Sequence, residues 1–426
     1  MTFSFLEYVA SALFVLGYIT ITLEHRIRTS KSAVALTLGS LLWLIVAFTG
    51  GEHFVEDIGH AGSEIFGIVI FLLAAMALVE VLVHYKFFDI VRSKLLAWEL
   101  SERKQFIVVS IFSFLLSAVI DNLTTTIVMI QMSRKFFRGE NLIRVAGMIV
   151  IAANAGGAFS PIGDVTTIML WLAGKFQSND IILGGVLPAL ALLIVAVTLT
   201  YSKIKPDPFD VKDESGTKFG KSEKIIIAMV FVSFALPVIM NAMGLPPYLG
   251  LLLGLGLVWI AIDLLKQVRP RQTHLDASIE EFIRKTDIPS LKFFIGILLT
   301  VSALSSLGVL GMFSHAFYGE SPSTVRIVLG NVALGALSAV VDNVPLTAIV
   351  IDTLPTNLAS LWVLLALTVG TGGSMLVIGS AAGVVAMGMI KELTFSKYIQ
   401  VAFVPAAAGF AAAVGVWCLQ YFILGI

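Results

Sequence analysis

Two Asp-Asn pairs lie near the centres of long apolar segments of this sequence. They are Asp121-Asn122 and Asp342-Asn343. An Asp at the centre of a membrane helix costs about 2.5–3.5 kcal/mol on insertion scales, so such residues are kept for pairing or for transport. Carboxylate, amide and hydroxyl oxygens are hard ligands that suit a small hard cation. The two pairs therefore predict cation binding within a membrane.

Two other apolar segments, 143–173 and 358–390, are too long for one straight helix and carry glycine-rich breaks. In the first, glycines let the backbone leave helical geometry, and Pro161 removes a helical hydrogen bond. The polar residues expected to line it are Asn154, Ser160, Asp164, Thr166 and Thr167. The second break has Ser374 and Ser380 but no carboxylate. We therefore expect the first break to be the more acidic site.

The candidate ion ligands all carry oxygen and lie in these four segments. They are Asp121, Asn122, Thr125, Thr126, Asn154, Asp164, Thr166, Thr167, Ser338, Asp342, Asn343, Thr347, Ser374 and Ser380. A small cation is expected at Asp121, Asn122, Asn154 and Asp164, with the two carboxylates binding it or a proton in turn. Glu80 is a proton-path candidate, or equally a partner for a basic residue. Capping of short helices by the Asp-Asn pairs is a compatible structural role.

Composition restricts the class of protein. The chain has 426 residues, of which 58% are hydrophobic and 13% charged, whereas soluble domains carry about 25% charged residues. The formal net charge is zero, so nothing indicates a nucleic-acid partner, and the single Cys418 excludes an internal disulfide framework. The sequence has no nucleophile–base pair or metal-ligand spacing, so we expect neither an enzyme nor a cofactor.

Lys and Arg positions predict the topology. If 105–131 and 324–352 are re-entrant hairpins, 26 of the 28 basic residues share one side, whereas full crossings split them 12 against 16. The positive-inside rule favours the hairpins and places both termini outside. The ten expected full spans are 3–23, 32–49, 63–84, 143–173, 180–201, 222–243, 246–265, 291–313, 358–390 and 397–424.

The two halves also share motifs in the same order. Residues 117–126 match 338–347, and residues 154–164 match 370–380. With the topology, this predicts an all-α polytopic membrane protein with an inverted repeat, two re-entrant hairpins and two discontinuous helices. The expected regions are N-terminal scaffold helices at 1–104, a first transport region at 105–202, a cytoplasmic linker at 203–223, second scaffold helices at 224–313 and a second transport region at 314–426.

The motifs at 117–126 and 154–167 resemble those of the ion transporter superfamily, and within it the NhaD-type sodium/proton antiporters. The resemblance implies a homodimer in which a fixed scaffold supports a moving transport domain. Related dicarboxylate symporters carry Ser-Asn-Thr at the hairpin tips, where this chain has Asp-Asn. Pro345-Leu346 in the second hairpin, against Thr124-Thr125 in the first, argues against equal cation binding by the two halves.

These observations predict a secondary transporter that exchanges Na⁺, with Li⁺ as a second candidate, for H⁺ by alternating access. The alternative is a Na⁺-coupled anion symporter or an oxyanion effluxer on the same scaffold, and a non-transporting membrane assembly is a third class. No cofactor is expected, because Na⁺ and H⁺ are the transported ions. The expected location is the inner membrane of a bacterium, with the lipid bilayer and a second copy of the chain as partners.

Overall fold

The structure is a computed structural model that describes residues 5–22, 27–49, 54–96, 98, 100–205, 220–268, 279–319 and 322–425. These residues form helices joined by short connections, with no strand among them. Most of the expected linker 203–223 lies outside the described residues. The prediction of an all-α polytopic protein is confirmed.

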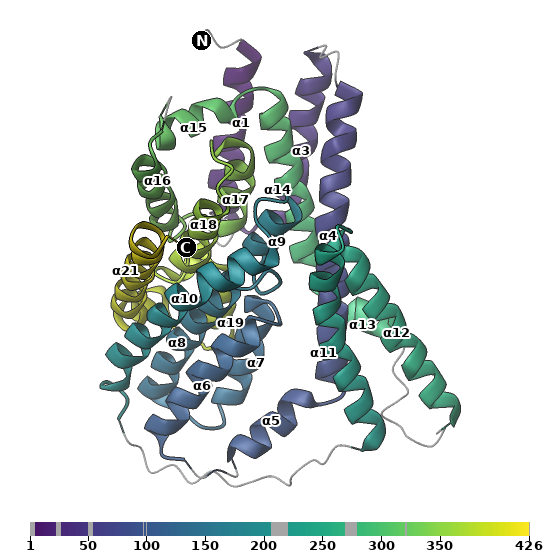
Figure 1. Cartoon of the computed structure of the whole chain (residues 1–426), viewed down its shortest axis with the longest axis vertical. Helices are drawn as coiled ribbons and strands as arrows, with labels where there is room; N and C mark the ends of the chain where they lie inside the picture. Colours follow the sequence, from purple (N-terminus) through teal and green to yellow (C-terminus); the bar gives the residue numbers. More distant parts are fainter. Residues whose placement is uncertain are drawn as a thin grey trace.

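One side of the molecule consists of helices from the two expected scaffold regions. They are α1 (Phe5–Thr22), α3 (Lys31–Phe48), α4 (Phe54–His84), α11 (Lys221–Ala242), α12 (Pro247–Val268), α13 (Ile279–Lys285) and α14 (Ile288–Ser306), whereas the short α15 (Leu310–Tyr318) packs against the expected hairpin 324–352 on the other side (Figure 1). Figure 1 shows α3, α4 and α14 side by side. A Cβ at Gly39 would lie 2.8 Å from the carbonyl oxygen of Gly296, so these glycines allow α3 and α14 to approach closely.

Helix α4 begins earlier than the sequence predicts. It has 31 residues and starts at Phe54 rather than near residue 63. At 1.5 Å per residue it is longer than the roughly 30 Å hydrocarbon core of a bilayer. Its first turn contains Glu56 and Asp57, which complement the positive end of the helix dipole. These two acidic residues belong to the helix and not to a preceding loop.

The first half of the other side contains one helical hairpin and one broken helix. Its elements are α5 (Phe87–Leu96), α6 (Glu102–Ser117), α7 (Asn122–Ser133), α8 (Gly139–Ala158), α9 (Val165–Leu172) and α10 (Ser178–Tyr201). Four residues, 118–121, join α6 to α7. The first break, residues 159–164, separates α8 from α9.

The second half repeats this order. Its elements are α16 (Thr324–Leu337), α17 (Asn343–Thr353), α18 (Ala359–Gly372), η2 (Val377–Gly379), α19 (Ala381–Met389), and a C-terminal run of α20 (Phe395–Tyr398), η3 (Ile399–Phe403), α21 (Val404–Leu419) and η4 (Gln420–Leu424). The second break, residues 373–380, separates α18 from α19. Figure 1 shows the α6–α7 hairpin in the lower half of the view and α16–α17 in the upper half.

The same side-chain contact holds each hairpin to its broken helix. Ser117 Oγ donates to the carbonyl oxygen of Ala153 at 2.6 Å, and Ser338 Oγ donates to that of Val369 at 2.8 Å. The two serines occupy matching positions in the sequence motifs. The motif match therefore corresponds to a shared packing arrangement.

Close backbone contacts are repeated in the same way. A Cβ at Gly156 would collide with the carbonyl oxygen of Phe114, and one at Gly372 would collide with that of Gly335. Glycine is required at both positions because any larger residue would separate the broken helix from the hairpin. This requirement explains why the two breaks share their glycines.

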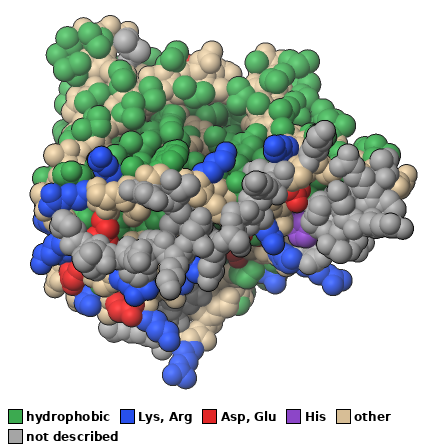
Figure 2. All heavy atoms as spheres, turned by 90° about the horizontal axis from the view of Figure 1, so that it is seen from below, with side chains coloured by type: hydrophobic (Ala, Val, Ile, Leu, Met, Phe, Trp, Pro, Cys, Tyr) green, Lys and Arg blue, Asp and Glu red, His purple; other side chains and the backbone are tan. Residues whose placement is uncertain are grey.

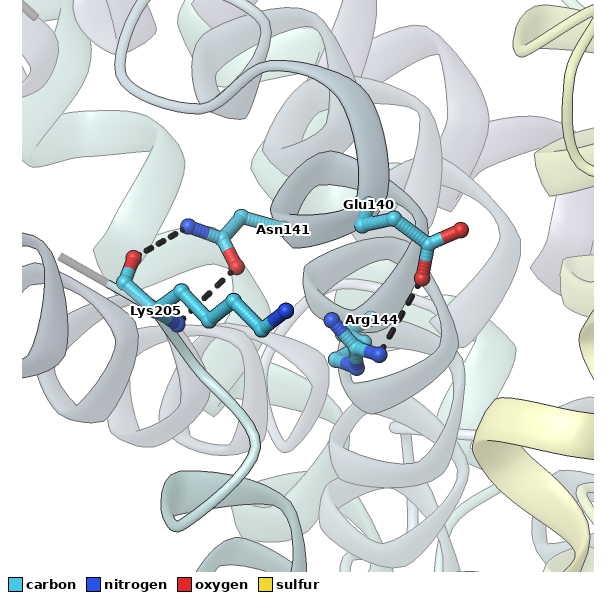
Figure 3. Close-up of polar contacts among 4 residues, drawn as sticks. All are labelled: Glu140, Asn141, Arg144 and Lys205. Carbon is cyan, nitrogen blue, oxygen red and sulfur yellow. Dashed lines mark hydrogen bonds and ion pairs between the residues drawn. The ribbon is translucent and has the colours of Figure 1, made fainter. Parts of the chain in front are cut away.

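Membrane crossing is supported by the lengths and compositions of the helices. Eight helical stretches within the described residues are long and apolar enough to span a bilayer. Of the ten expected spans, α1 falls short of that length in its described part, and the second broken helix is divided at Gly372. Figure 2 shows Lys and Arg side chains gathered on the lower face, where the α6–α7 hairpin lies. The orientation of the protein in the membrane remains a prediction.

Candidate ion-binding site

The Asp of each Asp-Asn pair caps the second helix of its hairpin. Asp121 accepts hydrogen bonds from Thr124 N at 2.8 Å and Thr124 Oγ1 at 2.7 Å. Asp342 Oδ1 accepts from Val344 N at 3.2 Å. A capping Asp satisfies backbone N–H groups that have no partner within the helix. The pairs thus have the structural role, and each Asn becomes the first residue of a helix.

Asn122 joins the first hairpin to the first broken helix. Its Nδ2 donates to Asn154 Oδ1 at 3.0 Å and to Asp164 Oδ1 at 2.9 Å. Thr166 Oγ1 donates to the second carboxylate oxygen of Asp164. All four side chains are buried. We call Asn122, Asn154, Asp164 and Thr166 the ion cluster.

Asn154 extends the ion cluster into the second half of the chain. Its Nδ2 donates to Ser374 Oγ at 2.9 Å and to Ser380 Oγ at 3.1 Å. Asp164 meets the second half at Gly370, where an added Cβ would lie 3.2 Å from Asp164 Oδ2. The two breaks therefore form one polar centre.

Asp164 is the carboxylate of this centre. It is 1% exposed, and its side-chain hydrogen bonds come from the neutral groups of Asn122 and Thr166. An ionised carboxylate in an apolar interior requires a compensating charge, and otherwise it binds a proton. This environment suits a group that alternates between a bound cation and a bound proton.

A central cavity of about 40 Å³ borders the ion cluster. Its polar lining comes mostly from the two hairpin tips and the first break, and it faces α3, α4 and α14 on the opposite wall. The polar and charged lining residues are Lys31, Asp121, Asn122, Asp164, Ser290, Asp342 and Asn343. A water molecule needs roughly 10–15 Å³ of such volume. The cavity therefore has room for a small ion with a few waters.

The carboxylate of Asp121 lies apart from the ion cluster. It lines the central cavity, but its side-chain bonds go to Thr124 and not to the cluster. No three His, Cys, Asp or Glu side chains within the described ranges converge on a point that could hold a metal ion. The structure thus brings Asn122, Asn154 and Asp164 together and places Asp121 beside them, facing the same cavity.

Three other predicted ligands form hydrogen bonds with the local backbone. Thr125 Oγ1 donates to the Ile120 carbonyl at 3.3 Å, and Thr347 Oγ1 donates to the Asn343 carbonyl at 2.9 Å. Ser380 Oγ, in addition to its bond with Asn154, caps α19 by accepting from Gly383 N at 3.2 Å. These hydroxyls stabilise the hairpins and the second break.

Two predicted hydroxyls, Thr126 Oγ1 and Thr167 Oγ1, are buried without a hydrogen-bond partner among the described residues. An unsatisfied buried hydroxyl is costly, so a water or an ion is the expected partner. Glu80 is half-buried on α4 and interacts electrostatically with Lys285. It is not part of the lining of the central cavity, and its role in a proton path or in pairing stays a prediction.

Sequence reasoning missed the scaffold side of the cavity. Lys31 is the first residue of α3 and lines the cavity. Ser290, in the first turn of α14, lines it as well. Asp287 caps α14 by accepting from Ser290 N at 3.2 Å, and its charge interacts with Asp121. In the sequence, Lys31 is one of many basic residues at the end of an apolar run. Nothing local distinguishes it from a lysine at the membrane interface.

Discontinuous helices that expose polar groups inside a helical membrane bundle are typical of secondary transporters. The fold and the site therefore indicate that this protein is a secondary transporter. Residues 18–370 match the model of a protein family whose description is "Citrate transporter". The chain is 36% identical to Sodium/proton antiporter 1 of Arabidopsis thaliana over 96% of its length and 72% of that relative. It is 31% identical to the Na(+)/H(+) antiporter NhaD of Alkalimonas amylolytica over 92% of its length and 86% of the relative.

The chain therefore belongs to the citrate transporter family and, within it, to the family of the NhaD Na⁺/H⁺ antiporters. Among solved structures it resembles MtrF of Neisseria gonorrhoeae, which is described as illuminating a class of antimetabolite efflux pumps. The TM-score is 0.56 at 9% identity, and the match covers 88% of this chain and 85% of that one. This likeness concerns the fold alone.

Proposed function

We propose that this protein exchanges Na⁺ for H⁺ across the membrane by alternating access, with Asp164 as the residue that binds either ion. The observation that carries the proposal is the environment of Asp164. Its carboxylate is buried, receives side-chain hydrogen bonds only from neutral groups, and borders a cavity of about 40 Å³. The names of the relatives agree with this exchange.

The coupling follows from the cost of burying a charge. With Na⁺ or a proton bound, Asp164 is neutralised and the site can face either side of the membrane. With neither bound, a buried anion would have to change sides at a cost of several kcal/mol. Exchange results because only the two neutralised forms change sides. Asn122, Asn154 and Thr166 position the carboxylate through their hydrogen bonds.

Asp121 supplies a second negative charge to the same cavity. Its negative field would raise the local concentration of cations. We assign Asp121 to attracting the ion and contacting it during entry, and Asp164 to holding it. Thr126 and Thr167 are candidate additional ligands because their buried hydroxyls have no partner among the described residues.

The anion alternative is disfavoured by the same cavity. A citrate or succinate ion would meet the three carboxylates of Asp121, Asp164 and Asp342 against the single ammonium of Lys31, so the cavity repels it unless further cations intervene. The volume of about 40 Å³ also fits a hydrated monatomic ion better than a dicarboxylate. The citrate transporter description of the family nevertheless makes citrate a necessary test compound.

The test uses purified protein in proteoliposomes with an imposed pH gradient and a fluorescent pH indicator. Na⁺, Li⁺, K⁺, succinate, citrate and arsenite are added in turn. We expect a proton flux with Na⁺ alone, and its loss in Asp164→Asn, which keeps the shape of the side chain without its charge. Asp263→Asn on α12, an exposed carboxylate near Lys266, is the matched control. A flux that requires citrate or succinate would overturn the proposal.

Placement in the cell is part of the same proposal. We place the protein as a homodimer in the inner membrane of a bacterium, with both termini outside and the transport regions 105–202 and 314–426 moving against the scaffold. The support is the Lys and Arg distribution and the separation of the two groups of helices in Figure 1. Labelling of single cysteines introduced near residues 5 and 425 would test the orientation, and cross-linking in native membranes would test the dimer.

A further inference from the structure

Lys31 is a charged residue on the scaffold wall of the central cavity. It is the first residue of α3, and its Nζ lies 4.9 Å from the centroid of the Phe293 ring on α14. An ammonium group is attracted to the face of an aromatic ring, which helps to fix its position. The cavity it lines also contains Asp164 and Asp342. The site therefore contains a built-in cation as well as its acidic residues.

Asp342, at the tip of the second hairpin, lines the same cavity as Lys31. The charge of Lys31 interacts with Asp342, and the backbone N–H of Asp342 donates to Tyr18 Oη at 3.1 Å. Tyr18 belongs to α1 and Lys31 to α3, so one scaffold helix bonds this tip and a second lines the cavity beside it. The second hairpin thus approaches a basic and hydrogen-bonding surface.

The first hairpin tip has an additional acidic neighbour. Asp121, which matches Asp342 in the repeat, shares the cavity with Lys31 but is also subject to the charge of Asp287, the capping residue of α14. The scaffold charges therefore balance Asp342 more than they balance Asp121. An exchanged cation is attracted to the surroundings of Asp121 and is not needed to neutralise Asp342.

We propose that Lys31 is the internal counter-cation of Asp342, so that the second hairpin is neutralised by the protein itself and the exchanged ion binds at Asp164. The inference rests on the proposed Na⁺/H⁺ exchange and assigns a specificity role within it. Lys31 suits this role because its long flexible stem places a compact charge beside a carboxylate. The second break has Ser380 where the first has Asp164, so neutralising Asp342 leaves a single acidic side, at Asp121 and Asp164.

The proposal predicts how Na⁺ binding responds when the pair is broken. The charged groups that share the cavity with Lys31 are Asp342 before α17, Asp121 before α7 and Asp164 before α9, and Asp287 before α14 acts on Asp121. Without the carboxylate of Asp342, the ammonium loses one negative charge from its surroundings and repels an incoming Na⁺ more strongly. Without the ammonium, Asp342 adds an unpaired negative charge and attracts it.

The test is a double-variant cycle in proteoliposomes that measures the Na⁺ concentration giving half-maximal proton flux. We expect Asp342→Asn to raise that concentration about tenfold or more. Lys31→Gln should lower it about threefold, and the double variant should return to within about threefold of the unmodified protein. Asn remains a good helix cap, so Asp342→Asn preserves the start of α17. A double variant as impaired as Asp342→Asn, or a rise with Lys31→Gln alone, would overturn the proposal.

A second readout separates this inference from the proposed function. The same four proteins are unfolded by heat in Na⁺-free detergent, where a direct pair gives a double variant less destabilised than the sum of the single variants. Lys266→Gln and Asp263→Asn, a surface pair at 3.7 Å, form the comparison cycle and should depart less from additivity, because solvent screens a surface pair. If the unmodified protein shows no Na⁺-dependent flux, the proposed exchange fails while the unfolding cycle still decides the pair. Additivity at Lys31 and Asp342 would refute the pairing.

Discussion

The two glycine-rich breaks have the same backbone frame and different chemistry. A Cβ at Gly157 would lie 2.6 Å from the carbonyl oxygen of Gly163, and one at Gly373 would lie 2.5 Å from that of Gly379. Each break therefore folds back on itself in the same way. The first contains Asp164, and the matching position of the second contains Ser380. The frame alone does not decide which ion binds.

The contacts between the breaks show how two positions create this difference. Asn154 donates to Ser380, while the matching pair places Gly370 against Asp164. One contact is a hydrogen bond between neutral side chains. In the other, the absent side chain of Gly370 leaves room for a carboxylate. A nearly symmetric scaffold thus acquires one acidic centre through an Asn–Ser pair and a Gly–Asp pair.

Replacing Asp164 by the serine found at the matching position of the second break should have the largest effect on Na⁺-dependent proton flux. Asp164→Ser removes the carboxylate that binds Na⁺ or a proton in turn, so Na⁺-dependent proton flux should fall to the level of empty liposomes. The measurement is indicator dequenching after a Na⁺ pulse. Thermal unfolding of the variant serves as the control for folding. Flux above one tenth of the unmodified rate would refute the role of Asp164.

The shared frame should be equally sensitive in both halves. Gly156→Ala and Gly372→Ala each drive a Cβ into a backbone carbonyl of the neighbouring hairpin. Overpacking of this kind costs about 1–3 kcal/mol or more, and we expect similar falls in thermal stability and in purified yield. Gly256→Ala, where nothing lies within 4 Å, should be tolerated. A large loss in one half only would contradict the repeated frame.

Gly370→Ala should weaken Na⁺ binding without unfolding the protein. An added Cβ would lie 3.2 Å from Asp164 Oδ2 and 3.3 Å from Ala158 Cβ, so the carboxylate must shift by a few tenths of an ångström. We expect the half-saturating Na⁺ concentration to rise about tenfold, equivalent to about 1.4 kcal/mol. Gly388→Ala on α19 meets nothing within 4 Å and should leave it unchanged.

The smallest effect is expected at Ser380. Ser380→Ala removes a hydrogen bond to Asn154 and the cap of α19, and each is worth about 1 kcal/mol. We expect a modest loss of thermal stability and at most a fewfold change in flux. Complete loss of flux would mean that the second break binds the exchanged ion directly, and the proposed asymmetry would then be wrong.

Much of the fold follows from local patterns in the chain. Apolar length predicts the helices, glycine and proline predict the breaks, and the paired motifs predict which segments correspond. The expected hairpin at 105–131 agrees with α6 and α7 to within three residues at its outer ends. Boundaries in polar flanks do not follow from the hydrophobic pattern, as at α4. There the helix begins before the hydrophobic segment does, because solvated residues can also be helical.

The sequence by itself determined the class of protein, the two polar hairpin tips and the greater acidity of the first break. These properties depend on composition and short-range spacing. Only the tertiary structure decided which oxygens meet. It bonded Asn122 to Asp164, placed Asp121 apart from them, and brought Lys31 from a distant helix to the same cavity. Such contacts join residues far apart in the chain, and they depend on how helices pack rather than on any local pattern.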